Sequence, residues 1–154
     1  ACKPNLTALA VPGVAGTSPF DETRDGNDAR SAGATAQACS LTMKGQQVFK
    51  FGVTTICDAV NGLCEQADIE VSAIDHFIFH QANERILAAA SARLGLDDTK
   101  VARTLAHTGN ISSACIPYTI DTLARNGELK QGELIALVGF GAGLDTGSCL
   151  MRWS

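Results

Sequence analysis

Apolar residues in this chain occur alternately at helical spacing and in short continuous runs, which predicts alternating helices and strands. The helical spacing covers residues 45–66, 83–94 and 113–125. The short runs cover residues 5–11, 74–80, 101–106, 134–139 and 148–153. We therefore predict an α/β fold with a five-stranded, mostly parallel mixed sheet and helices on both faces. The last two strands follow each other across a glycine-rich turn and are expected to pair antiparallel.

Two segments add to this picture. Residues 12–41 are rich in Gly, Ser, Thr, Asp and Ala without a period, which is typical of a long lid or binding loop. The helix over residues 113–125 carries only Asp121 and Arg125 as charged residues, which indicates a helix buried between layers. A single sheet offers little to bury it with, so we expect a further half of the fold outside this sequence. No repeat or linker divides the chain, and residues 1–154 are predicted to form one domain.

The composition is that of a globular protein and excludes several classes. The 154 residues are 45% hydrophobic and 18% charged. A net charge of −4 without a basic run argues against nucleic-acid binding, and no apolar stretch approaches the roughly 20 residues of a membrane-spanning helix. The six cysteines form no Cys-x-x-Cys pair, and no secretory leader pattern opens the chain. Reduced thiols in the cytoplasm are predicted, with a disulfide framework as the less favoured alternative.

Polar or glycine-rich positions follow three of the predicted strands. His80 ends one apolar run, Asn110 lies shortly after the next, and residues 139–143 form a glycine-rich loop. Because strand ends and helix starts open onto one crevice in such a sheet, we expect these groups to form one wall of an active site. A neutral imidazole and a carboxamide both donate hydrogen bonds, so together they suit stabilisation of an enolate next to a thioester or ketone.

Each of these residues taken alone has a plainer interpretation. A histidine at a strand end is commonly structural, Asn110 could cap a helix, and the glycines could form a tight turn. His76 and His80 have the spacing of a helical zinc site, but they lie in a strand-like run without the accompanying glutamate. We expect no metal. Cys115 is interpreted as a packing residue, and so is Cys149.

The joint order of the motifs resembles the C-terminal half of a β-ketoacyl-acyl carrier protein synthase III, a thiolase-fold condensing enzyme. The resemblance covers about residues 43–154. Its motifs are Met43-Lys44-Gly45-Gln46-Gln47-Val48-Phe49-Lys50, His80-Gln81-Ala82-Asn83-x-Arg85-Ile86, Gly109-Asn110-x-Ser112 and Gly139-Phe140-Gly141-x-Gly143. It implies a thiolase-like half whose N-terminal counterpart, with the nucleophilic cysteine, is absent from this sequence.

The resemblance also implies the activity and partners of the whole enzyme. Such an enzyme transfers an acyl group from coenzyme A to its cysteine and condenses it, with loss of CO₂, with malonyl-acyl carrier protein to begin fatty acid biosynthesis. It is a cytoplasmic homodimer and uses no cofactor beyond its substrates, acyl-CoA and malonyl-acyl carrier protein. The present chain, lacking the nucleophile, is predicted to be inactive alone.

Site residues follow from the same resemblance, position by position. His80 and Asn110 match the pair that holds the malonyl thioester carbonyl. Ala142 matches the backbone donor of the oxyanion hole, and Phe140 matches a residue lining the active site. Three residues match basic positions that bind the carrier protein: Arg85, Lys50 and Arg93.

The chain departs from the family pattern at several positions. Ala142 replaces a glycine, Ile111 stands where threonine is common, and Thr146-Gly147 replaces a Trp-Gly pair. Cys115 stands where the family has serine. These departures leave open another thiolase-fold acyltransferase of secondary metabolism. A non-catalytic half that only scaffolds a partner chain is the second alternative.

Overall fold

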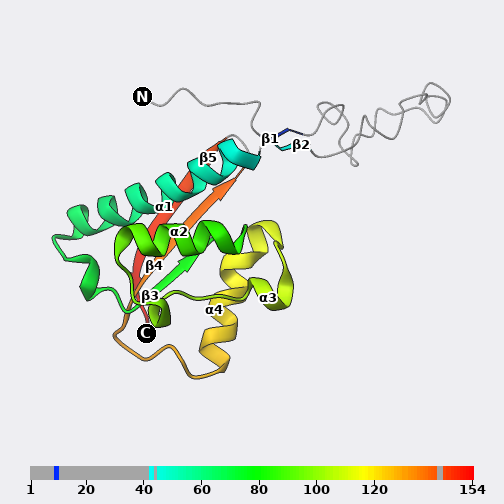
Figure 1. Cartoon of the computed structure of the whole chain (residues 1–154). Coiled ribbons are helices and arrows are strands. Elements are labelled where there is room, and N and C mark those ends of the chain that lie inside the picture. Colours follow the sequence, from blue (N-terminus) through cyan, green and yellow to red (C-terminus); the bar gives the residue numbers. More distant parts are fainter. Residues whose placement is uncertain (1–8, 11–41, 44, 142–143) are drawn as a thin grey trace, which may run out of the picture. The chain divides into compact units, whose positions relative to one another are not determined.

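The computed structural model describes residues 9–10, 42–43, 45–141 and 144–154 of the chain (Figure 1). The chain divides into two compact units. In the first, β1 (Leu9–Ala10) pairs antiparallel with β2 (Thr42–Met43) in a two-stranded sheet of its own. The loop predicted over residues 12–41 lies outside the described residues, as does most of the strand predicted over residues 5–11.

The second unit contains a three-stranded mixed sheet in the order β3-β4-β5. β3 (His76–Phe79) runs parallel to β4 (Leu134–Gly141), and β4 pairs antiparallel with β5 (Asp145–Arg152). The mixed character and the antiparallel final pair are confirmed. The prediction of a single five-stranded sheet is wrong among the described residues, because β1 pairs elsewhere and one predicted strand does not form.

The strand that does not form was predicted over residues 101–106. Val101 makes an isolated parallel bridge to Phe77, and the Ala102 N–H donates to the Phe77 carbonyl at 3.0 Å. The chain then leaves the sheet edge and enters a short helix, α3 (Leu105–Thr108). The apolar run therefore lies beside β3 without extending the sheet.

The buried side chain of Gln81 explains why residues 102–105 do not extend the sheet. Its Nε2 donates to the Ala102 carbonyl at 3.2 Å. Its Oε1 accepts from the backbone N–H groups of Thr104 at 3.0 Å and Leu105 at 3.3 Å. A side chain thus satisfies backbone groups that a neighbouring strand would otherwise bind, so these residues need no ladder.

Three longer helices lie near their predicted positions: α1 (Gly45–Ala67), α2 (Glu84–Leu94) and α4 (Cys115–Arg125). Two 3₁₀ turns, η3 (Val71–Ala73) and η4 (Asp98–Lys100), lie in the connections. A third, η5 (Ser112–Ala114), delays the start of α4, which places Pro117 in the first turn where its missing N–H is tolerated. None of the described helices has both the length and the apolar character to cross a bilayer.

Two hydrophobic clusters lie on opposite faces of the sheet. Phe77, Phe79 and Val138 point to one face and pack with residues of α1 and α2. Ile78 and Ile135 point to the other face and pack with residues of α4. Alternate residues of a strand face opposite ways, so β3 supplies both clusters. The predicted helices on both faces are confirmed.

The burial of α4 and β5 is less complete than the sequence predicts. α4 buries Cys115, Thr119 and Leu123 along one stripe, whereas Tyr118 remains 43% exposed. Cys149 is exposed, so its predicted packing role is wrong within the described structure. The reason is that β5 forms the edge of the sheet and carries mainly exposed residues there. Among the described cysteines, all are free thiols.

Candidate active site

His80 lies directly after β3, where the sheet presents the ends of its parallel strands. Its backbone N–H donates to the Val138 carbonyl at 2.8 Å, which fixes the residue to β4. The half-buried ring meets Phe140 edge to face, with centroids 5.1 Å apart at 88°. On another side, Nδ1 lies 2.8 Å from the sulfur of Cys115, the first residue of α4. The ring is therefore held by groups from β4 and α4.

Burial lowers the pKa of His80 below its ordinary value, because the charged imidazolium loses hydration. The ring is neutral at pH 7 and carries one N–H. With Nδ1 facing the Cys115 sulfur, Nε2 is the ring nitrogen that no described residue contacts by a hydrogen bond. His80 can thus offer a neutral Nε2–H donor to a ligand.

Asn110 is exposed and lies in the turn that leads into α4. Its Oδ1 accepts from the Ser112 N–H at 2.9 Å. This contact orients the carboxamide, and no described residue accepts a hydrogen bond from Nδ2. Gly109 before it has φ +65° and ψ −166°, a conformation open essentially only to glycine, which explains the Gly-Asn pair. Asn110 therefore presents a donor at the same end of the sheet as His80.

Gln81 is the functional residue that sequence reasoning left without a role. It is fully buried, and its carboxamide makes hydrogen bonds to four backbone groups, the fourth being the Phe79 carbonyl at 2.9 Å. It joins the end of β3 to the segment that leads to Asn110. The signal available in the sequence was a glutamine directly after an apolar strand, inside the histidine motif.

Phe140, the residue predicted to line the site, lies with its ring beside that of His80. Its ring also meets Phe51 of α1 edge to face, with centroids 6.2 Å apart. Gly52 makes this approach possible, because a Cβ there would lie 3.0 Å from the Phe140 ring and 3.2 Å from Ile86. The oxyanion-hole residue predicted from the sequence, Ala142, lies outside the described residues.

The three basic residues predicted to bind a carrier protein are exposed. Arg85, in the first turn of α2, places its guanidinium 5.9 Å from the centre of the Phe49 ring. Lys50 is the residue after Phe49 on α1. Arg93 lies in the last turn of α2, and burial raises the pKa of the nearby Cys57 thiol although the charge of Arg93 acts in the opposite direction. Arg85 and Arg93 therefore lie at opposite ends of α2.

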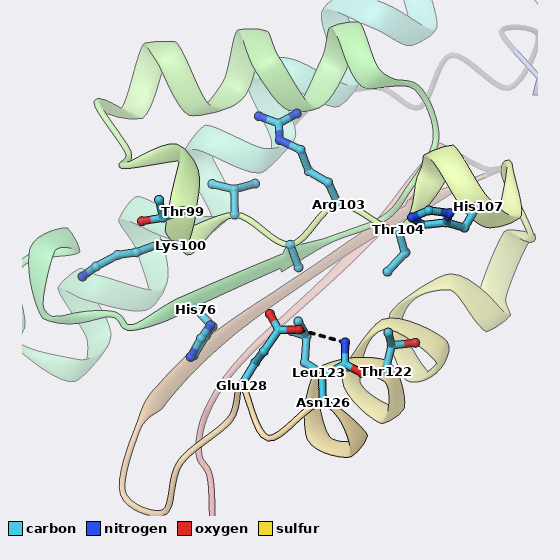
Figure 2. A pocket seen from close by; sticks show the side chains of 12 residues that line it. His76, Thr99, Lys100, Arg103, Thr104, His107, Thr122, Leu123, Asn126 and Glu128 are labelled. Carbon is cyan, nitrogen blue, oxygen red and sulfur yellow. Dashed lines mark hydrogen bonds between the residues drawn. The ribbon is translucent and has the colours of Figure 1, made fainter.

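A pocket of about 250 Å³ lies between α4 and residues 99–107, on a part of the fold that neither His80 nor Asn110 lines (Figure 2). Its cations already have partners. Lys100 donates to the Ile74 carbonyl at 2.7 Å, and Arg103 is directed toward α2, where it pairs with Glu84.

His76 also lines this pocket, and its Nε2 lies 3.1 Å from Glu133. His76 is the first residue of β3 and His80 follows its last residue, so the two histidines do not form a pair. No group of three or more potential metal ligands occurs among the described residues.

Comparison with known proteins places the chain in a family. Residues 64–153 match the family model described as 3-oxoacyl-[acyl-carrier-protein (ACP)] synthase III C terminal. The chain is 39% identical over 114 residues to the β-ketoacyl-[acyl-carrier-protein] synthase III of Synechocystis sp., which covers 74% of this chain and 34% of that protein. It is 43% identical over 113 residues to the Staphylococcus aureus protein of the same name, which covers 73% and 36%.

Solved structures give the same result. A 3-oxoacyl-(acyl carrier protein) synthase III from Pseudomonas aeruginosa matches with a TM-score of 0.78 and 32% identity, over 97% of this chain and 40% of that one. Xanthomonas campestris OleA matches with a TM-score of 0.70 and 26% identity, over 75% and 34%. The chain spans about a third of the length of the relatives it matches in sequence. Since the matched model covers more than half of it, the chain belongs to the 3-oxoacyl-[acyl-carrier-protein] synthase III family.

Proposed function

We propose that this chain forms the C-terminal half of an enzyme that condenses an acyl-CoA primer with malonyl-acyl carrier protein at the start of fatty acid biosynthesis. The acyl group is carried as a thioester on a cysteine of the N-terminal half. Loss of CO₂ from the malonyl group leaves its electron pair as an enolate, which attacks the acyl thioester and releases the cysteine thiolate. His80 and Asn110 stabilise the enolate oxygen by hydrogen bonding.

The observation that carries this proposal is the hydrogen bonding of His80. Its ring is neutral, Nδ1 faces Cys115 at 2.8 Å, and Nε2 has no hydrogen-bond partner among the described residues. The Asn110 carboxamide supports it, because Ser112 engages Oδ1 and leaves Nδ2 as a donor. Two neutral donors suit a developing oxyanion and need no acid beside them, whereas hydrolysis would require a positioned base.

The remaining roles are part of the same proposal. The Ala142 N–H contributes to the oxyanion hole for the acyl-enzyme, and Phe140 excludes water beside His80. Arg85, which lies over the Phe49 ring, and Lys50 bind the acidic carrier protein, and Arg93 at the other end of α2 is a further contact for it. No cofactor is required, the whole enzyme is a cytoplasmic homodimer, and this chain alone does not condense.

The outward face of α4 supports a partner half. Tyr118 is 43% exposed on a helix whose only charged residues are Asp121 and Arg125. Exposing the weakly charged surface of such a helix to water is unfavourable, so a helix of this kind is typically covered on more than one side. The N-terminal half, which also carries the nucleophile, is proposed to cover it.

The test is release of CO₂ from a malonyl thioester by this chain assembled with its N-terminal half. We expect His80→Ala and Asn110→Ala each to lower the rate roughly a hundred- to a thousand-fold, the typical loss of one oxyanion donor. His107→Ala is the matched control, because His107 is an exposed histidine outside the site, and it should keep the wild-type rate. Full activity of His80→Ala would refute the catalytic role and leave the scaffold alternative.

The same assembly distinguishes the other acyltransferase alternative. The departures at Ile111 and Thr146, and the likeness to Xanthomonas campestris OleA, justify a screen of acyl donors and acceptors. Turnover with a short acyl-CoA and malonyl-acyl carrier protein supports the proposal. Turnover only with other donors or acceptors would assign the chain to a different thiolase-fold acyltransferase.

A further inference from the structure

Cys115 lies at the centre of a buried contact that neither packing nor nucleophilic chemistry explains. Its side chain is buried, with 1% relative exposure, and its sulfur faces two nitrogens from the end of β3. Nδ1 of His80 lies 2.8 Å away, and the backbone N–H of Gln81 donates to the same sulfur at 3.4 Å. A thiol so enclosed is poorly accessible to an acyl substrate, but it can direct the imidazole.

The hydrogens of this cluster are consistent with one arrangement. The Gln81 N–H donates to the sulfur, so the sulfur already acts as an acceptor there. The thiol hydrogen has one acceptor in reach among the described residues, Nδ1 of His80. If Nδ1 carried the ring proton instead, the sulfur would accept twice and its own hydrogen would have no partner, which is unfavourable in a buried site.

We propose that the Cys115 thiol is a positioning residue that donates to Nδ1 of His80 and holds the imidazole as its Nε2–H tautomer. The Nε2–H then points to the thioester oxygen, so this proposal deepens the proposed function and rests on it for its catalytic consequence. The ring nitrogen opposite a fixed partner is the one that acts, as in metal and triad sites where a neighbouring group sets the tautomer.

A closed set of hydrogen bonds holds the thiol in place. The Thr119 hydroxyl, 0% exposed, donates to the Cys115 carbonyl at 2.7 Å and also lies 2.8 Å from the Thr104 hydroxyl. The Thr104 N–H in turn donates to the side chain of Gln81. The backbone N–H of Gln81 donates to the Cys115 sulfur, which closes the set. The end of β3, the segment before α3 and the first turn of α4 are joined, so the sulfur has little freedom to move away from the ring.

The tautomer can be measured directly in the 154-residue chain. We would label the histidines with ¹⁵N, assign His80 by comparison with His80→Gln, and read the separate shifts of its two ring nitrogens. Wild type should show Nε2 protonated and Nδ1 unprotonated. Cys115→Ser should show the same, because a hydroxyl also donates. Cys115→Ala should show a mixture, and Cys57→Ala, which removes a buried thiol away from His80, should leave the wild-type pattern.

Kinetics of the assembled enzyme give a second readout that loss of packing would not produce. Removing one donated hydrogen bond in Cys115→Ala should lower kcat for decarboxylation about two- to tenfold with little change in KM. The acid limb of the pH profile should move to higher pH, because Nδ1 is protonated more readily without a donor. Cys115→Ser should restore both.

The outcomes are separable. Protonated Nδ1 in wild type overturns the proposal without the need for any variant, and so does an unchanged tautomer with unchanged kcat in Cys115→Ala. A shifted tautomer in Cys115→Ala together with a fully active His80→Ala supports the positioning contact and refutes the proposed function. A wild-type tautomer in Cys115→Ala, with His80→Ala inactive, refutes the positioning role and leaves the proposed function intact.

Discussion

Replacing Gln81 by alanine tests whether its side-chain hydrogen bonds hold residues 102–105 beside β3. The carboxamide is 0% exposed and provides the acceptor for the Thr104 and Leu105 N–H groups. Its removal orphans the buried Thr104 N–H and two carbonyls, and it leaves a small cavity. A buried donor without a partner costs about 1–3 kcal/mol, whereas Leu105 is half-buried and can recover water. We therefore expect Gln81→Ala to lower the free energy of unfolding by about 3 kcal/mol.

Urea unfolding measures this loss, and amide hydrogen exchange locates it. The unfolding midpoint of Gln81→Ala should fall, and the Thr104 and Leu105 amides should exchange faster than in wild type. Gln131→Ala is the matched control, since Gln131 is exposed in the turn before β4, and it should change stability by less than about 0.5 kcal/mol. If Gln81→Ala behaves like this control and both amides stay protected, then something other than Gln81 keeps residues 102–105 out of the sheet.

Three further predictions follow from the same region. Gly52→Ala should destabilise by about 1–3 kcal/mol, measured by urea unfolding, because its Cβ would meet the Phe140 ring at 3.0 Å; a neutral result would mean that Phe140 moves freely. Because the pKa of His80 is lowered in the folded chain, the unfolded chain binds this proton more readily. The stability that neutral His80 contributes is therefore fully present above the ordinary histidine pKa of about 6.5 and is lost as the pH falls toward the lower folded pKa. Stability curves at several pH values should lose this component in His80→Gln, and an unchanged slope would contradict it. In the assembled enzyme, Arg85→Glu should raise KM for the carrier protein several-fold at low salt, with kcat retained, whereas the exposed Lys130→Glu should not; equal effects would refute the docking role.

Much of the framework could be predicted because it depends on local patterns. Helical spacing located α1, α2 and α4, because a helix must turn one stripe of apolar residues toward the core. Asn83 and Gly95 mark the ends of α2 in the way that helix caps do. The motifs around His80 and Asn110 indicated the candidate catalytic pair, because the order and spacing of motifs can be read directly from the sequence.

The sequence misjudged residues 101–106 because an apolar run reports burial and not the identity of the hydrogen-bond partner. Val101 and Ala102 are buried as a strand would be, yet a side chain from Gln81 takes the place of the next strand. The prediction for Cys149 failed for a related reason. The pattern of apolar residues along β5 does not indicate whether another element covers that strand, and among the described residues β5 is the edge of the sheet.

What the sequence alone determined is therefore the three longer helices, the final antiparallel pair and the chemistry available at the strand ends. Only the tertiary structure decided which of these groups touch. Cys115 and His80 are separated by 35 residues in the chain, and the contact between them exists because the end of β3 meets the start of α4. Gly52 and Phe140 meet only where α1 crosses β4. Such contacts depend on the packing of elements distant in sequence, which no local period encodes.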